Sequence, residues 1–455
     1  MTRSTADVVI CGAGMAGVAA AYHLAVRRGV TNVVLVDERP PLTLTSDKGT
    51  EAYRNWWPGH GETMVRFMNR SIDVLEELAH ESNNCFQLNR RGYVFLTGRP
   101  EQIARMRDTA TAISALGAGP LREHPGPSPY VPSKPQGFDD LPSGADLVVD
   151  RTLVRQQFPF IAEDVVAMLH VRRCGWLDAE QLGKWLLAQA QAHGVRLRQD
   201  RVERVTVAGG RIQRINLRSG EALSTRTFVI AAGPFLREVG AMLGLDIPVF
   251  NELHGKMAFR DTLRIVPREA PLMIWTDPLA LPWTEAERER LAAGEETRWL
   301  LEEFPAGVHF RPRGDADNPI LLVIWTYDTR AQEPVWPPRF DAHYPEVLLR
   351  GLARMIPHLS AYFGQGSQGY VDGGYYCKTR ENRPLIGPLP VEGAYVIGAL
   401  SGYGVMGSQA AGELLAAHVT GGNLPDYAPS FLLNRYEDPA YQALLANWDA
   451  SSGQL

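Results

Sequence analysis

Three glycines near the start of the chain have the spacing of a nucleotide-binding turn. Gly12, Gly14 and Gly17 form a G-x-G-x-x-G motif directly after the apolar run at residues 8–10. In such a turn the first glycine permits a tight bend and the second lets the backbone approach a pyrophosphate. The third lets the following helix pack close to the strand, and the helix N-terminus faces the negative charge. The motif predicts a dinucleotide site, although a glycine-rich turn without a ligand is the alternative.

The residues around this motif make it more specific than the glycines alone. The β-branched run at 8–10 is typical of a buried parallel strand, and residues 18–26 form an alanine-rich helical stretch. A second apolar run ends at Asp37, 25 positions after Gly12. An acid in this place is positioned to accept a hydrogen bond from a ribose hydroxyl. Taken alone, the unit is compatible with NAD or FAD.

Two later segments repeat the order of strand, small-residue turn and helix. The run at 227–230 ends in the turn 231–233, and the run at 395–398 leads through the glycine-rich turn 401–407 into an alanine-rich stretch at 410–419. Turns of small residues allow a bound group to approach the backbone. N–H groups at a helix start stabilise an anion or an electron-rich ring. We therefore expect the first and last thirds of the chain to build one site.

Composition and charge argue against several classes of function. The chain has 455 residues, of which 46 are basic and 51 acidic, so a nucleic-acid partner is not indicated. No run is long and apolar enough to span a bilayer. The four cysteines are far apart, so neither a disulfide framework nor a metal site is expected. Because the first strand begins within a few residues of the N-terminus, we expect no cleaved signal and a cytoplasmic protein.

Five motifs, in order along nearly the whole chain, resemble those of the D-amino acid oxidase family of FAD-dependent oxidoreductases. They are residues 12–17, Gly175-Trp176-Leu177-Asp178, residues 229–234, Arg383-Pro384-Leu385-Ile386-Gly387 and Leu400-Ser401-Gly402-Tyr403-Gly404-Val405-Met406. The branch with sarcosine oxidase, glycine oxidase and dimethylglycine dehydrogenase is the most similar. Together the motifs are specific for the family but not for a substrate.

The resemblance implies a two-domain fold of the mixed α/β class. A Rossmann-like FAD-binding domain is expected to be discontinuous, over residues 1–84, 151–240 and 370–455. A substrate-binding domain built on a mainly antiparallel sheet is expected over residues 85–150 and 241–369. Within the second domain, the proline-rich segment 117–143 has no clear periodicity, and is expected to be a surface loop or, less favourably, a lid.

The resemblance also implies an FAD cofactor that is bound non-covalently. The residues expected along it are Gly12, Gly14, Met15, Ala16, Gly17, Asp37, Glu38, Arg39, Ser46, Lys48, Val202, Ala232, Gly233, Gly402, Tyr403, Gly404 and Val405. Asp37 or Glu38 would bind the ribose, and Val202 would lie near the adenine. Some relatives link the flavin through a cysteine, but Cys377 is displaced from that position, so a plain buried thiol is favoured.

The implied reaction oxidises a C–N bond of an amine or of an amino acid, which can be N-substituted. A hydride passes from the carbon next to nitrogen to flavin N5, and the resulting imine is hydrolysed. A lysine credited with activating oxygen in sarcosine oxidase has no counterpart at 321–326, so oxygen and another electron acceptor both remain open. The alternatives are another FAD enzyme such as a monooxygenase, which the absence of a Gly-Asp pair in the late motif disfavours, and a non-catalytic flavoprotein.

Six residues beside the FAD motifs are expected to surround the space over the flavin ring. They are Tyr53, Arg54, Tyr327, Tyr375, Lys378 and Tyr403. Arg54 matches the arginine that helps bind the substrate carboxylate in sarcosine oxidase, whereas Met406 stands in the place of the partner lysine. His309 and Asp328 also lie on or near strands that could face a pocket, although ordinary structural roles are favoured for them. In the loop before Arg54, Ser46 or Thr50 could cap a helix.

Overall fold

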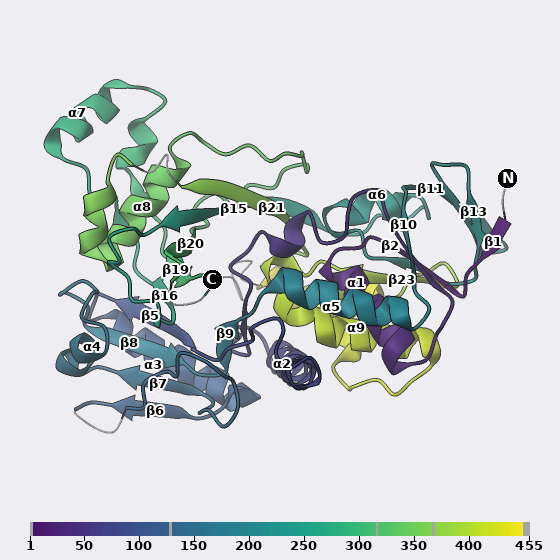
Figure 1. The fold of residues 1–455 in the computed structure, drawn as a ribbon, viewed down its shortest axis with the longest axis horizontal. Coiled ribbons are helices and arrows are strands. Elements are labelled where there is room, and N and C mark those ends of the chain that lie inside the picture. Colours follow the sequence, from purple (N-terminus) through teal and green to yellow (C-terminus); the bar gives the residue numbers. More distant parts are fainter. Residues whose placement is uncertain (1–2, 127–129, 315–316, 366–368, 449–455) are drawn as a thin grey trace.

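The computed structural model describes residues 3–126, 130–314, 317–365 and 369–448. Figure 1 shows two lobes along the longest axis of the molecule, one built around a mainly parallel sheet and the other around a mainly antiparallel sheet. The mixed α/β two-domain architecture expected from the sequence is confirmed. Within the described residues, no helix combines the length and the apolar composition needed to cross a membrane.

A six-stranded sheet forms the core of the first lobe. Its order is β10 (Arg196–Gln199), β3 (Val33–Asp37), β2 (Val8–Cys11), β14 (Phe228–Ile230), β23 (Ala394–Gly398) and β22 (Leu385–Pro388). All neighbours are parallel except β22 and β23. The sheet therefore brings together strands from the first, middle and last parts of the chain, with β2, β14 and β23 adjacent.

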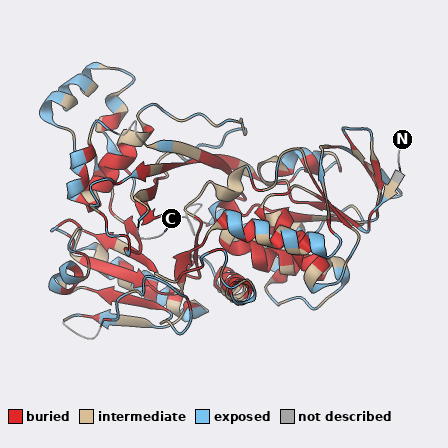
Figure 2. Cartoon of the chain, viewed as in Figure 1, coloured by how far each residue is buried: buried red, intermediate tan, exposed pale blue. Residues whose placement is uncertain are grey.

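Alternate residues of the central strands enter two different cores, because successive side chains of a strand point to opposite faces. Val8 and Ile10 pack against helices α1 (Met15–Tyr22), α5 (Ala179–Ala192) and α9 (Gly404–Thr420). Val9 packs instead against a four-stranded sheet of β1 (Arg3–Thr5), β13 (Ala222–Ser224), β12 (Arg211–Leu217) and β11 (Val202–Ala208). Figure 2 shows α5 with an exposed outer face. The near-continuous apolar runs of these strands reflect burial on both sides.

A nine-stranded sheet forms the second lobe, and only β5/β16 and β6/β7 are parallel neighbours. Its order is β21 (Tyr370–Lys378), β15 (Phe250–Arg260), β20 (Ile320–Ile324), β19 (His309–Pro312), β16 (Leu272–Trp275), β5 (Tyr93–Thr97), β8 (Ala167–Val171), β7 (Ala145–Val148) and β6 (Leu121–His124). Helices α3 (Gln102–Ile113), α4 (Arg151–Gln157) and α8 (Tyr344–Met355) pack around it.

The remaining helices and strands are shorter or link the lobes. They are β4 (Ala52–Arg54), β9 (Cys174–Trp176), α2 (Thr63–Glu81), α6 (Leu236–Ala241), β17 (Leu279–Ala280), α7 (Glu285–Ala293), β18 (Glu303–Phe304) and α10 (Pro439–Ala446). Strand β4 pairs with β9 between the two large sheets. Helix α2 packs against α9 of the first lobe.

The domain division differs from the expected boundaries at two strands. Strands β8 and β21 lie in ranges that the sequence assigns to the FAD-binding domain, yet both belong to the nine-stranded sheet. Strand β8 pairs with β5 and β7, and β21 pairs with β15 along nine residues. An apolar run indicates a buried strand but carries no information about the sheet it joins, so these pairings were invisible in the sequence.

The proline-rich segment 117–143 is not loop throughout, because it supplies β6, the edge strand of the nine-stranded sheet. The Tyr130 hydroxyl lies 2.7 Å from His170 Nδ1, and Ser133 donates a hydrogen bond to the Arg91 carbonyl. Residues 127–129 of this segment lie outside the described residues. None of its described residues lines the cavity that contains the candidate site.

Candidate active site

A cavity of about 460 Å³ lies between the two large sheets, a size typical of small-molecule sites. The glycine turn after β2 and the late turn before α9 both line it. Its other wall comes from β15, β19 and β21 and from the residues after β20. The first and last thirds of the chain therefore build one site, and the nine-stranded sheet closes it.

The turn between β2 and α1 has room for glycine alone at two positions. Gly12 has φ +112°, and a Cβ atom there would lie 2.3 Å from the Ala231 carbonyl oxygen. A Cβ atom on Gly17 would lie 1.9 Å from the Gly12 oxygen, so this glycine packs the helix onto the strand and does not line the cavity. The first residues of α1, Met15 and Ala16, line the cavity, so the N-terminus of this helix lies at the cavity.

The two acids after β3 have different partners. Asp37 accepts hydrogen bonds from the backbone N–H groups of Ala13 and Arg39, at 2.7 and 2.9 Å. Burial raises the pKa of Asp37, and these two hydrogen bonds oppose that rise. Glu38 also lines the cavity, with Oε1 2.9 Å from the Arg39 guanidinium. Asp37 thus holds the glycine turn in place, whereas the Glu38 carboxylate pairs with arginine side chains, those of Arg39, Arg201 and Arg218.

Ser46 supports the same turn from a distant loop. It lies in one turn of 3₁₀ helix over Thr45–Asp47 and accepts a hydrogen bond from the Met15 N–H, at 2.9 Å. The expected helix after Ser46 or Thr50 is absent from this described stretch, because β4 begins at Ala52. The hydroxyl therefore caps α1 rather than a local helix. Lys48 does not line the cavity and pairs with Asp372, at 2.7 Å.

Several segments that line the cavity, including the late turn before α9, have a strained backbone conformation. Five non-glycine residues with positive φ line the cavity, namely Leu42, Glu51, Asn382, Ala399 and Ser401. Such residues concentrate where the surrounding structure must place backbone groups accurately. The Tyr403 hydroxyl donates to the Asn382 carbonyl at 2.9 Å, which ties two of these segments together. A side chain on Gly402 would strike the ring of Tyr376.

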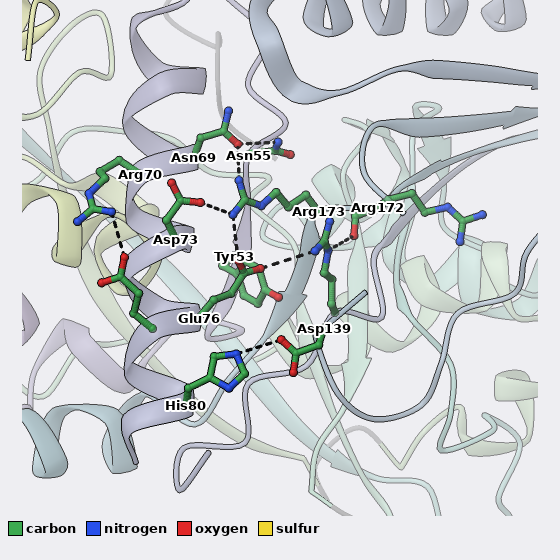
Figure 3. Close-up of polar contacts among 12 residues, drawn as sticks. Tyr53, Asn55, Asn69, Arg70, Asp73, Glu76, His80, Asp139, Arg172 and Arg173 are labelled. Carbon is green, nitrogen blue, oxygen red and sulfur yellow. Dashed lines mark hydrogen bonds and ion pairs between the residues drawn. The ribbon is translucent and has the colours of Figure 1, made fainter. Parts of the chain in front are cut away.

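Arg54 reaches the cavity from β4, which is fixed by polar contacts to α2 (Figure 3). Arg173, next to β9, pairs with Asp73 and Glu76 of α2, and Asn55 donates to Asn69. The Arg54 side chain is buried and donates to the Trp56 carbonyl at 3.1 Å. Burial lowers the pKa of Arg54 from its ordinary 12.5.

The nine-stranded sheet contributes polar groups that the sequence analysis missed. His254, Thr326 and Tyr376 line the cavity together with His309, for which a structural role had been favoured. Burial lowers the pKa of His309 to about 4, so its imidazole is neutral at pH 7. Glu252, His254 and Lys256 alternate along β15, and this period-two pattern of polar residues in a buried strand was the available signal.

Three of the six residues expected over the flavin ring line the cavity, and three do not. Arg54, Tyr375 and Tyr403 line it. Tyr53 points the opposite way from Arg54, as neighbours in a strand do, and its hydroxyl donates to the Asn89 carbonyl. Tyr327 packs among aromatic rings, including those of Phe304, Trp325 and Tyr344. Lys378 lies behind the wall, bonded to Glu252. Asp328 also lies away from the cavity, paired with Arg330.

Of the residues expected along the cofactor, all except Gly17 and Lys48 line the cavity. They are Gly12, Gly14, Met15, Ala16, Asp37, Glu38, Arg39, Ser46, Val202, Ala232, Gly233, Gly402, Tyr403, Gly404 and Val405. Cys377 lines it as well, and burial raises the pKa of its thiol to about 12. This thiol is therefore protonated at neutral pH.

A family model described as DAO, FAD dependent oxidoreductase, matches residues 7–418. The chain belongs to this family. The resemblance drawn from the five motifs is confirmed, and the DAO family implies FAD as the cofactor. The cavity fits such a group, because it combines two helix N-termini with glycine positions where the backbone is bare.

This DAO-family chain is similar to three proteins that carry a name. It is 24% identical to mitochondrial dimethylglycine dehydrogenase of Rattus norvegicus over 317 residues, which are 67% of this chain and 33% of that protein. The chain thus spans about a third of that relative. The crystal structure of L-proline dehydrogenase from P. horikoshii has a TM-score of 0.73 at 18% identity, covering 96% of this chain and 99% of that chain. Glycine oxidase from Geobacillus kaustophilus has a TM-score of 0.71 at 18% identity, with the same coverage. These two likenesses establish the fold.

Proposed function

We propose that this FAD-dependent oxidoreductase oxidises the C–N bond of an amine or amino acid. The observation that carries the proposal is the wall of the cavity, where buried Arg54 and the neutral imidazole of His309 face the space beside the late turn. A guanidinium in a desolvated place is suited to a carboxylate. The names of the similar proteins, which include amino-acid oxidases and dehydrogenases, support the same class of substrate.

The residues at each end of the cavity would hold the cofactor in different ways. Backbone N–H groups at the start of α1 would bind the pyrophosphate, and Glu38 is the acid placed for a ribose hydroxyl. Residues 402–405 at the start of α9 would stabilise negative charge on the ring. When bound, FAD supplies the hydride acceptor for the C–H bond next to nitrogen.

The protein's own part in the reaction is to bind and orient the substrate. Arg54 would anchor a carboxylate, and Tyr375 and Tyr376 would limit the space around the reacting carbon. Holding the C–H bond in a reactive arrangement contributes much of the rate in such a reaction. No strong base is required for removal of a hydride, and the two cavity histidines are weak ones.

A panel of amines tests this function directly. The yellow protein is mixed anaerobically with glycine, dimethylglycine, L-proline and benzylamine, and the flavin absorbance is followed. Bleaching by at least one of them is the expected result, and the absence of bleaching would contradict the proposal. Admitting oxygen afterwards measures reoxidation, which separates an oxidase from a dehydrogenase that uses another acceptor.

A further inference from the structure

Four polar side chains form a continuous chain from the interior of the nine-stranded sheet to the cavity. Lys378 Nζ lies 3.1 Å from both carboxylate oxygens of Glu252. Glu252 Oε2 lies 3.0 Å from His254 Nε2, and His254 Nδ1 lies 2.9 Å from Thr326 Oγ1. His254 and Thr326 line the cavity, whereas Glu252 and Lys378 do not. The chain therefore begins at a buried ion pair and ends at a hydroxyl that faces the site.

The direction of each hydrogen bond follows from the charge on Glu252. Burial would raise the pKa of Glu252, but the hydrogen bonds and charges of His254 and Lys378 lower it below its ordinary value. Glu252 is then a carboxylate and can only accept, so His254 Nε2 must carry the hydrogen. His254 Nδ1 is left as an acceptor, and the Thr326 hydroxyl donates to it. The lone pairs of the Thr326 oxygen remain for a donor in the cavity.

His254 is neutral and is surrounded by charged and aromatic side chains of three strands. On its own strand it faces Glu252, and from β21 it faces Lys378 and the ring of Tyr376, which stacks on it at 3.9 Å. From β19 it faces His309. Burial lowers the pKa of His254, so at pH 7 the imidazole is neutral and its Nδ1 carries a lone pair that can accept.

His309 provides an internal comparison. Its Nδ1 lies 2.8 Å from the Gly307 carbonyl oxygen, so this histidine is oriented by the backbone and not by a carboxylate. An imidazolium at His254 would be stabilised by the negative charge of Glu252. Of the two cavity histidines, His254 is therefore the one built to receive a proton.

We propose that Thr326 and His254 form a path that removes the proton of the substrate ammonium, with Glu252 and Lys378 as positioning residues. This inference rests on the proposed function, because an amine must be neutral before a hydride leaves the neighbouring carbon. An aliphatic ammonium has a pKa of about 10, so most substrate arrives protonated at pH 7. The path lets the protein bind and oxidise the protonated amine, which is the abundant form of the substrate at pH 7.

The step moves one proton and no electrons to the protein. The ammonium N–H bond breaks, its electron pair stays on nitrogen, and the proton goes to Thr326 Oγ1. The original Thr326 hydroxyl proton passes at the same time to His254 Nδ1. The products are a neutral amine and an imidazolium paired with Glu252, and the imidazolium later releases its proton to water.

The pH dependence of anaerobic flavin reduction tests the path, with the fastest amine of the panel as substrate. In the unaltered protein the limiting rate should change little between pH 7 and 9. In Thr326→Val and His254→Asn it should fall by roughly 10³-fold at pH 7 and then rise by about tenfold per pH unit, because the neutral amine alone reacts. Thr326→Ser keeps the hydroxyl and should restore the flat profile. His309→Asn should change the rate but not the shape of its pH profile.

Binding of 2-aminoisobutyrate gives a second readout that does not depend on turnover, because this amino acid has no C–H bond next to nitrogen. Its affinity, measured by calorimetry, should fall on acidification below pH 6 in the unaltered protein, as a protonated His254 repels the ammonium. In His254→Asn this fall should be absent. Equal pH profiles in Thr326→Val and the unaltered protein would overturn the path while leaving the oxidation of amines intact. Failure of every panel amine would instead count against the proposed function.

Discussion

Arg54 is buried, and burial disfavours the charged form of its guanidinium. The side chain is 3% exposed, and its Cζ atom lies 5.1 Å from the centre of the Trp57 ring. An interaction between this guanidinium and a ligand carboxylate would be screened much less than one at the surface. Under the proposed function, Arg54 is the residue of the cavity that would bind the substrate carboxylate.

We expect Arg54→Gln to raise KM for an amino-acid substrate by roughly 10- to 100-fold, the loss of one charged hydrogen-bonding interaction. KM for benzylamine, which has no carboxylate, should change far less. Steady-state kinetics with both substrates measure the difference, and the melting temperature controls for damage to the fold. Equal changes for the two substrates would remove Arg54 from carboxylate binding.

Three glycines with positive φ differ in the space around them. Substituting each one by alanine therefore distinguishes effects on stability from effects on cofactor binding. A Cβ atom on Gly12 would collide with the Ala231 carbonyl, whereas one on Gly233 (φ +52°) or Gly209 (φ +60°) would meet nothing within 4 Å. Gly233 lines the cavity, and Gly209 is an exposed residue of the hairpin between β11 and β12.

We expect Gly12→Ala to lower the free energy of unfolding by more than about 3 kcal/mol, through overpacking against backbone. Gly233→Ala and Gly209→Ala should each cost about 1 kcal/mol, the strain of a left-handed alanine. Only Gly233→Ala of this pair should weaken FAD binding, since its methyl group enters the cavity. Denaturant unfolding and fluorescence titration with FAD measure the two effects. A Gly12→Ala protein as stable as its parent would contradict this account of the turn.

At the scale of elements, a buried carboxylate joins the last three strands of the nine-stranded sheet. Asp146 on β7 accepts hydrogen bonds from Arg122 of β6, at 2.7 and 2.9 Å, and from Arg172, directly after β8. His124 Nε2 lies 2.8 Å from the same carboxylate. Burial raises the pKa of Asp146, but these partners outweigh it and hold the pKa well below its usual range.

We expect Asp146→Asn to destabilise the protein by about 3–5 kcal/mol, because it leaves a buried arginine charge without its partner. In the unaltered protein this contribution is complete above about pH 4, the pKa of an unfolded aspartate, and is lost as the pH falls through the lower folded value. Urea unfolding at pH 7 and at pH 3 checks both statements. Glu392→Gln, in an exposed pair with Arg211, is the matched control and should cost at most about 1 kcal/mol.

Elements of the first lobe were predictable because their signals are local. The glycine turn, the apolar strands and the Asp178 cap of α5 all follow from neighbouring residues, and Asp178 indeed accepts from the Gln181 N–H. The role of Ser46 was not predictable, since its partner Met15 is 31 residues away. The polar residues of β15 were unpredictable for the same reason. The alternation of a strand places Glu252 and His254 on one face, but it does not say which cavity that face meets.

At the scale of the whole molecule, the cofactor part and the substrate part share a single cavity. Residues from the six-stranded sheet and from the nine-stranded sheet line it, and β21 leads directly from one sheet to the segment before β22 of the other. The resemblance to a family predicted this arrangement more fully than composition or periodicity did. Side chains from separate segments line the cavity, among them Arg54, His309 and Tyr375, and no local pattern brings them together.

The adjacency of β2, β14 and β23 affects how the protein can fold during its synthesis. Strand β2 is made early, but its sheet waits for β14 and then for β23, and the late turn is synthesised long after the glycine turn. During this interval the glycine turn therefore lacks the adjacent strands β14 and β23, and it lacks the late turn that lines the same cavity. The complete cavity, and with it the site for the cofactor that the family implies, therefore exists only after the late turn has been made.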